Sequence, residues 1–255
     1  MKPLPKRLGH GEEATLVEHL GELRTRLIVS IAALLVGTSV AYAFHARLVR
    51  WLVHALPPDR RHLITLGVAE PFTTSMWIAI YAGLLLSMPI VLWQLWAFLA
   101  PAIEAHAERT VLGLVAFATA LAAVGLAFGY FVVLPAAVKF LTHYDDNLYN
   151  VQIRARDYLS FASMVMIAVV VVFEVPIFIL ALVRLGLLSS RKLRKNRRIG
   201  YAIMAALAVA LPGVDPVTTI LEMVPLMLLF EASIWLSVLV DQRRERASET
   251  AEGLM

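Results

Sequence analysis

Long apolar runs separated by short polar stretches dominate the chain. They lie at 27–44, 72–99, 110–134, 158–183, 199–211 and 216–240. A helix needs about 20 apolar residues to cross a hydrocarbon core of roughly 30 Å, because unpaired backbone groups are too costly in lipid. The pattern therefore predicts an all-α, polytopic membrane protein with six transmembrane helices. The run at 199–211 rises only about 20 Å, so the bilayer should be thin on that side.

The stretches between the runs predict two local structures. The segment 45–71 begins by alternating arginine and tryptophan with leucine and valine, which favours a short helix lying on the membrane surface. The stretch 212–216 leaves almost no loop between the last two spans. Asp215 before Pro216 is typical of an N-cap followed by proline at the first helical position.

Composition supports a membrane protein and excludes several kinds of chemistry. Hydrophobic residues make up 60% of the 255 residues and charged ones only 16%, which is unlike a soluble domain. No cysteine is present, which excludes disulfides, thiolate nucleophiles and iron–sulfur clusters. H-E-x-x-H, G-x-S-x-G and phosphate-binding glycine motifs are absent, so we expect no enzyme, no metal site and no cofactor.

The distribution of positive charges along the chain indicates the membrane topology. The net charge is +4, but the basic residues form short clusters between apolar runs, so nucleic acid is not the expected partner. Most of the 23 lysines and arginines fall in the segments on the N-terminal side of the membrane. The positive-inside rule then places both termini in the cytoplasm. We expect one domain over 1–240, opening with a cytoplasmic amphipathic segment at 1–26, and a disordered cytoplasmic tail at 241–255.

Two glutamates lie near the middle of predicted spans. A carboxylate at Glu174 or Glu231 costs on the order of 2.5 to 3.5 kcal/mol in lipid, so each either faces a polar cavity or partner, or is a hydrogen-bonded packing residue. Pro176 opens a break beside Glu174 and favours a functional role there. We expect Glu174 to face a hydrated concave surface open to the cytoplasm. Glu222, on the opposite helix face from Glu231 and nearer the interface, is expected to be a tolerated acid.

Acids also gather on the predicted inner side. Glu22 can pair with Arg26 one helical turn later, or bind a cationic partner. The loop after the second span carries Glu104 and Glu108 and is the only net-acidic short inner loop. Gln94, between two tryptophans, is expected to be an interfacial anchor.

Several motifs resemble one family in order along nearly the whole chain. They are HLGELR at 19–24, WAF at 96–98, APA at 100–102, FEVP at 173–176, DP at 215–216 and FE at 230–231. The chain is similar to TatC, the core receptor subunit of the twin-arginine protein translocase. This resemblance implies a glove-shaped helical protein of the prokaryotic inner membrane. It also implies binding of twin-arginine signal peptides, the single-span partners TatB and TatA, the protonmotive force, and a homo-oligomer within the receptor complex.

The resemblance also implies site residues. Glu22 and one loop acid, Glu104 or Glu108, would receive the two arginines of the signal peptide. Arg24, Gln94 and Phe98 would complete this signal-peptide site. The implied intramembrane and partner contacts are Glu174, Asp215, Thr219 and Glu231.

Two other functions remain open from the sequence. A secondary transporter would use Glu174 for proton coupling, although no matching halves with broken helices are visible. A purely structural scaffold is the third hypothesis.

Overall fold

The computed structural model describes residues 16–99, 107–144, 148, 151–185, 187–212 and 215–252. Apart from one isolated bridge, regular structure in these residues is helical, as predicted. The elements are α1 (Leu16–Ala43), α2 (His45–His54), η1 (Pro58–Arg60), α3 (Glu70–Leu99), α4 (Ala107–Phe128), η3 (Gly129–Val133), α5 (Leu134–His143), α6 (Ala155–Phe173), α7 (Val175–Arg184), α8 (Ser190–Lys195), α9 (Arg197–Ala210) and α10 (Pro216–Glu252).

Five helical segments among the described residues are long and apolar enough to cross a membrane. They are Leu20–Ala43, Glu70–Phe98, Leu112–His143, Ala155–Arg184 and Pro216–Leu239. The remaining predicted span, the fifth, corresponds to α9, which has only 14 residues and rises about 21 Å. The short fifth span is therefore present as a helix of the expected length.

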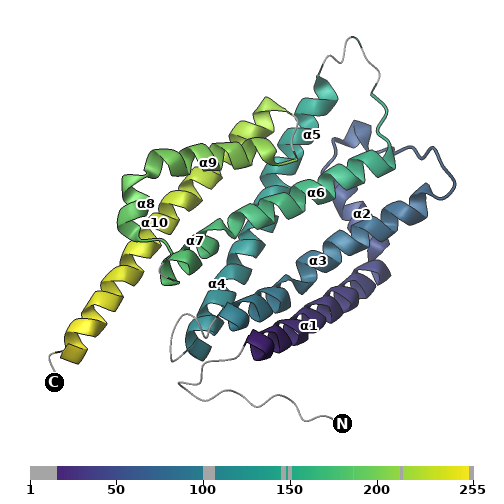
Figure 1. The fold of residues 1–255 in the computed structure, drawn as a ribbon. Helices are drawn as coiled ribbons and strands as arrows, with labels where there is room; N and C mark the ends of the chain where they lie inside the picture. The colour runs from purple at the N-terminus through teal and green to yellow at the C-terminus, as the bar shows by residue number, and fades with distance from the viewer. Residues whose placement is uncertain are drawn as a thin grey trace, which may run out of the picture.

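The helices form an elongated, fanned array (Figure 1). α1 lies along α3, and α9 runs antiparallel to α10 as the predicted hairpin. α6 packs against both α3 and α4 in the middle of the array. The first turn of α1 and the last turn of α10 lie toward the same end of the molecule (Figure 1).

The third predicted span is longer than 110–134. Its helix continues through a π-helical turn, η3, into α5, which ends at His143. Leu134 N–H bonds to Gly129 O across that turn, and Pro135 follows in the first turn of α5. Because the π-helical turn is wider, no backbone N–H donor is needed at Pro135, so the helix does not end at this proline.

The predicted disordered tail at 241–255 is also wrong in part. α10 continues past residue 240 to Glu252 without a break. The residues beyond the apolar run are mainly Glu, Arg, Gln and Ala, which favour helix and need no apolar surroundings. At the other end, α1 already begins at Leu16, inside the predicted segment 1–26.

α1 packs on α3 through a glycine contact. A Cβ built on Gly83 would lie 2.5 Å from the backbone nitrogen of Thr38, and one on Gly37 would lie 2.8 Å from Gly83 O. Only residues without side chains allow two helix backbones to approach so closely, a packing mode common in membranes.

The surface helix predicted after the first span is α2. Leu52 is buried in a cluster with Leu134 and Tyr158. Tyr158 donates its hydroxyl to Leu52 O at 2.7 Å, and Tyr130 donates to Trp51 O at 2.9 Å. Both carbonyls lie in the last turn of α2, where helix carbonyls lack a full set of backbone partners, so the tyrosines attach this helix end to η3 and α6.

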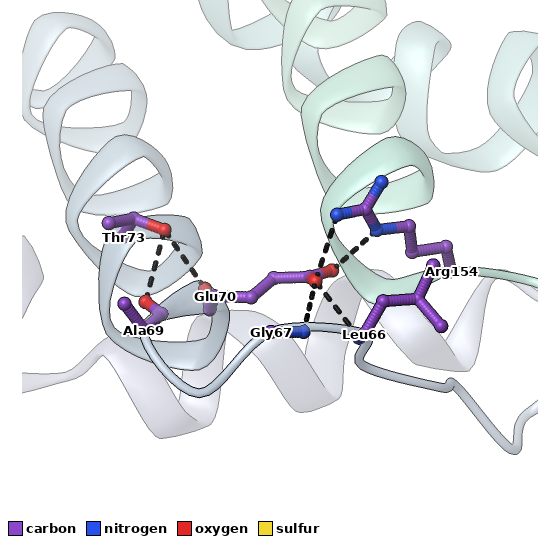
Figure 2. A network of polar contacts seen from close by, with 6 residues as sticks. All are labelled: Leu66, Gly67, Ala69, Glu70, Thr73 and Arg154. Carbon is purple, nitrogen blue, oxygen red and sulfur yellow. Dashed lines mark hydrogen bonds and ion pairs between the residues drawn. The ribbon is translucent and has the colours of Figure 1, made fainter.

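Glu70 joins two segments that are far apart in sequence (Figure 2). Its Oε1 accepts from Arg154 Nε at 2.9 Å, and its Oε2 accepts from Arg154 Nη2 at 3.0 Å. The backbone N–H groups of Leu66 and Gly67 also donate to Oε2, at 3.0 and 3.2 Å. Beside this contact, Ile64 N–H bonds to Ile153 O at 3.0 Å. The carboxylate is 6% exposed and fully satisfied, so it ties the start of α3 to the start of α6.

The glycine contact predicts a steric penalty. Gly83→Ala should lower the free energy of unfolding by about 1 to 3 kcal/mol, the cost of overpacking, because the methyl group meets backbone that cannot rotate away. Thermal unfolding in detergent measures the effect. Gly113→Ala is the matched control, since a Cβ there meets nothing within 4 Å among the described residues, and it should leave stability unchanged or slightly raised. Equal effects of the two substitutions would refute the close contact.

The Glu70 tie predicts coupling between two residues. Glu70→Gln and Arg154→Gln should each lower the midpoint of thermal unfolding, because each leaves a charged partner unpaired. The double variant should lose less than the sum of the two losses. Asp59→Asn, which removes a pair with a 65% exposed carboxylate, is the control and should have little effect. Additive losses would show that the pair does not act as a unit.

Candidate functional site

The first predicted site brings together Glu22, Arg26 and Gln94. Glu22 and Arg26 lie one turn apart near the start of α1, and Gln94 lies near the end of α3. Arg26 Nε donates to Glu22 Oε1 at 2.9 Å, and Arg26 Nη1 donates to Gln94 Oε1 at 3.4 Å. The predicted Glu22–Arg26 pair is therefore confirmed, and Gln94 holds the arginine from a second helix rather than only anchoring the interface.

The pair leaves half of the Glu22 carboxylate available. Arg26 Nη2 also donates to Oε1, so both bonds fall on the same oxygen. The Glu22 side chain is 33% exposed, and Oε2 accepts no hydrogen bond from the described residues. A carboxylate oxygen can accept further N–H donors, so this group can still bind a cation from outside.

The other predicted members of this site are placed only in part. Arg24 is exposed on α1, and Phe98 is half-buried near the end of α3. Glu104 lies outside the described residues. Glu108 is described only by its backbone, in the first turn of α4.

Glu174 lies at the break between α6 and α7, as Pro176 predicted. It is 1% exposed, and neither carboxylate oxygen has a hydrogen-bond partner among the described residues. The expectation that it faces a hydrated concave surface is wrong for the chain alone, because helix packing covers the side chain. An unpaired buried carboxyl group is costly and calls for a proton or a polar partner.

Glu231 is a hydrogen-bonded residue of the α9–α10 hairpin. Its Oε1 accepts from the Tyr201 hydroxyl, and its Oε2 lies 3.4 Å from Arg197 Nη2. Next to this cluster a Cβ on Gly200 would lie 2.0 Å from the ring of Phe230. These contacts favour the hypothesis that Glu231 is a hydrogen-bonded packing residue.

Asp215 caps α10, as predicted. Its Oδ1 accepts from Thr218 N at 2.8 Å, and its backbone oxygen accepts from Thr219 Oγ1 at 3.0 Å. Glu222, expected to be a tolerated acid, is 3% exposed, with Oε2 unpaired among the described residues. Leu226, one turn further along α10, is fully buried, so neighbouring helices cover this face of α10.

Sequence reasoning missed the Glu70–Arg154 pair. The two residues lie 84 positions apart, and no spacing rule connects them. The local signal was an acid just before the predicted span 72–99, and negative charge is favourable at a helix start. The described residues contain no group of three or more His, Cys, Asp or Glu side chains able to hold a metal ion.

Comparison with known proteins agrees with this architecture. The family model described as "Sec-independent protein translocase protein (TatC)" matches residues 18–225. The TatC protein of Carboxydothermus hydrogenoformans is 32% identical over 230 residues, covering 90% of this chain and 95% of that protein. The TatC protein of Escherichia coli K12 is 34% identical over 232 residues, covering 87% of each chain.

A solved structure shares the fold. The crystal structure of the twin-arginine translocase receptor TatC in DDM superposes with a TM-score of 0.77 at 32% identity. The match covers 86% of this chain and 99% of that one. Sequence motifs, helix arrangement and overall similarity agree, and the chain is a multi-pass membrane protein that belongs to the TatC family of Sec-independent protein translocase proteins.

Proposed function

We propose that this chain is the receptor subunit of a twin-arginine translocase, a non-enzymatic protein that binds the signal peptides of folded cargo at the cytoplasmic face of the inner membrane. The observation that carries the proposal is the Glu22 carboxylate, which is 33% exposed beside Arg26 and Gln94 and has one oxygen that accepts no hydrogen bond from the described residues. Family membership favours this function over a proton-coupled solute transporter or a scaffold.

The Glu22 group suits one arginine of the signal peptide. A guanidinium has a planar fork of N–H donors that matches a carboxylate, whereas a lysine ammonium is a point charge. The incoming arginine binds Oε2 while Arg26 stays on Oε1, held by Gln94. The second arginine needs a second acid, which either Glu104, before α4 in the chain, or Glu108, in the first turn of α4, supplies.

The proposed orientation has both termini in the cytoplasm. The start of α1 and the end of α10 lie at the same end of the array (Figure 1). α8 and the first turn of α9 carry the densest run of basic residues, 191–198, which the positive-inside rule places in the cytoplasm.

The α9–α10 hairpin is the proposed face for TatB and TatA, in a receptor complex that holds more than one copy of this chain. α9 is shorter than the hydrocarbon core, and such mismatch favours helix association. Val209 is 71% exposed near the end of α9, and Thr219 is half-buried across the turn.

Cysteines at Val209 and Thr219 should crosslink to TatB or TatA. Crosslinks confined to α1 and α3 would disprove the α9–α10 hairpin as the partner face.

Glu174 is the proposed intramembrane contact for an inserted signal peptide or a partner helix. Its two oxygens are covered and have no partner among the described residues, so a polar group that enters beside the α6–α7 break gains a hydrogen bond that these residues do not supply. Proton transfer at Glu174 is a separate part of this proposal.

The first prediction concerns signal-peptide binding. Glu22→Ala should weaken binding of a twin-arginine peptide by about 1.5 to 3 kcal/mol, the range for hydrogen bonds to charged groups. Titration of a labelled peptide into the purified protein measures this change. A Lys-Lys version of the peptide should bind wild type weakly and should lose little more in the variant. Unchanged affinity of a normally folded Glu22→Ala protein would remove Glu22 from the site.

The second prediction separates two roles of Glu174. Glu174→Gln keeps the shape and the hydrogen-bonding ability but cannot titrate, whereas Glu174→Ala removes both. If Glu174 acts as a polar contact, the Gln variant should export a twin-arginine reporter almost normally. The Ala variant should then lose export. Loss in both variants would support titration. Normal export by the Ala variant would show that Glu174 is only a packing residue.

A further inference from the structure

Two apolar hollows adjoin on the face formed by α2, α3, α4 and α6. The deeper one has a volume of about 160 Å³, and its lining includes Met88, Pro89 and Ala122. The shallower one, of about 50 Å³, lies under α2, with Trp51 and Tyr81 in its wall. Both are lined by Leu85 and Leu126, so together they form one continuous groove.

The groove runs along the helix axis rather than across it. Tyr81 and Pro89 lie eight residues apart on α3, which is about 12 Å along the helix. Trp51 and Tyr81 lie in the wall at the shallow end of the groove, and Met88 and Pro89 lie in the wall at the other end. The groove therefore extends along α3 within the apolar span Glu70–Phe98. A dry cavity of about 150 Å³ suffices for benzene, so the deeper hollow can hold several carbons of an alkyl chain.

Positive charge lies at the shallow end of the groove. α2 turns Leu52 into the core and leaves Arg47, Arg50 and His54 exposed. Arg47 lies 5.7 Å from the centre of the Phe44 ring, and no ion pair of Arg47 or Arg50 is found among the described residues. In sequence, the two arginines directly precede Leu48 and Trp51, which line the groove. Guanidinium groups bind phosphate in a bidentate manner.

We propose that this groove binds one acyl chain of an anionic phospholipid, whose phosphate Arg47 and Arg50 hold. The apolar wall accounts for the acyl chain, the alignment along α3 accounts for its direction, and the exposed arginines, which form no ion pair with the described residues, account for the anion. An apolar peptide segment would fill the same wall, but it brings no anion to the arginines. The arginines therefore favour the lipid over the peptide.

The test uses the full-length protein in detergent with two lipid probes, phosphatidylglycerol and phosphatidylcholine, each titrated and followed by native mass spectrometry. Wild type should bind phosphatidylglycerol more tightly. Arg47→Gln and Arg50→Gln should each weaken phosphatidylglycerol binding about fivefold and leave phosphatidylcholine binding unchanged. The control, Arg191→Gln on the exposed face of α8, should bind both lipids as wild type does.

Substitutions that fill the groove with a larger side chain test whether its apolar wall binds the acyl chain. Ala122→Phe should weaken binding of both lipids. Ala123→Phe, at an exposed lining position where the ring does not overpack the core, should do the same in a stably folded protein. Equal affinity of wild type for the two lipids would overturn the proposal, as would unchanged lipid binding in both phenylalanine variants. Competitive displacement of phosphatidylglycerol by a twin-arginine peptide would assign the groove to the peptide instead.

Discussion

The Glu70 carboxylate fixes one end of the helix array. It accepts two hydrogen bonds from Arg154 and two from backbone N–H groups, in a setting that is almost closed to solvent. A buried charge is stable only when it is paired and hydrogen-bonded, and here Oε1 accepts one donor and Oε2 accepts three. Because the donors come from the α2–α3 connection and from the start of α6, the order of the helices at this end follows from one side chain.

Away from that end, the packing is apolar and depends on shape. In lipid, apolar contact with a neighbouring helix brings little advantage over contact with lipid tails, so close fit has to hold the helices together. Gly83 lets α1 touch α3 backbone to backbone, and Gly200 lets the ring of Phe230 lie on α9. The two outermost helices of the array are thus attached by glycines.

Features that depend on neighbouring residues in sequence could be predicted, and features that depend on tertiary contact could not. The apolar runs predicted the spans, and Pro176 predicted the break in the fourth span. Asp215 before Pro216 predicted the cap of α10. Such local effects act within one helical turn. The Glu70–Arg154 pair could not be predicted, because only the fold brings these two residues together. The burial of Glu174 and Glu222 also depends on which helices cover them. Within the candidate site, the pairing of Glu22 with Arg26 was visible from spacing, whereas the contact with Gln94 joins residues 68 positions apart.

The break at Glu174 divides the fourth span into two parts with different neighbours. α6 is tied at its first residues through Arg154 and packs on α3 and α4. α7 packs on α10, and its Ile177 is buried in a cluster with Trp96 of α3. The two parts are joined through a turn in which Pro176 contributes no N–H, and proline interruptions of this kind are where helices bend. Glu174, whose carboxylate has no hydrogen-bond partner among the described residues, therefore lies at the pivot of any change in the angle between the two packed parts.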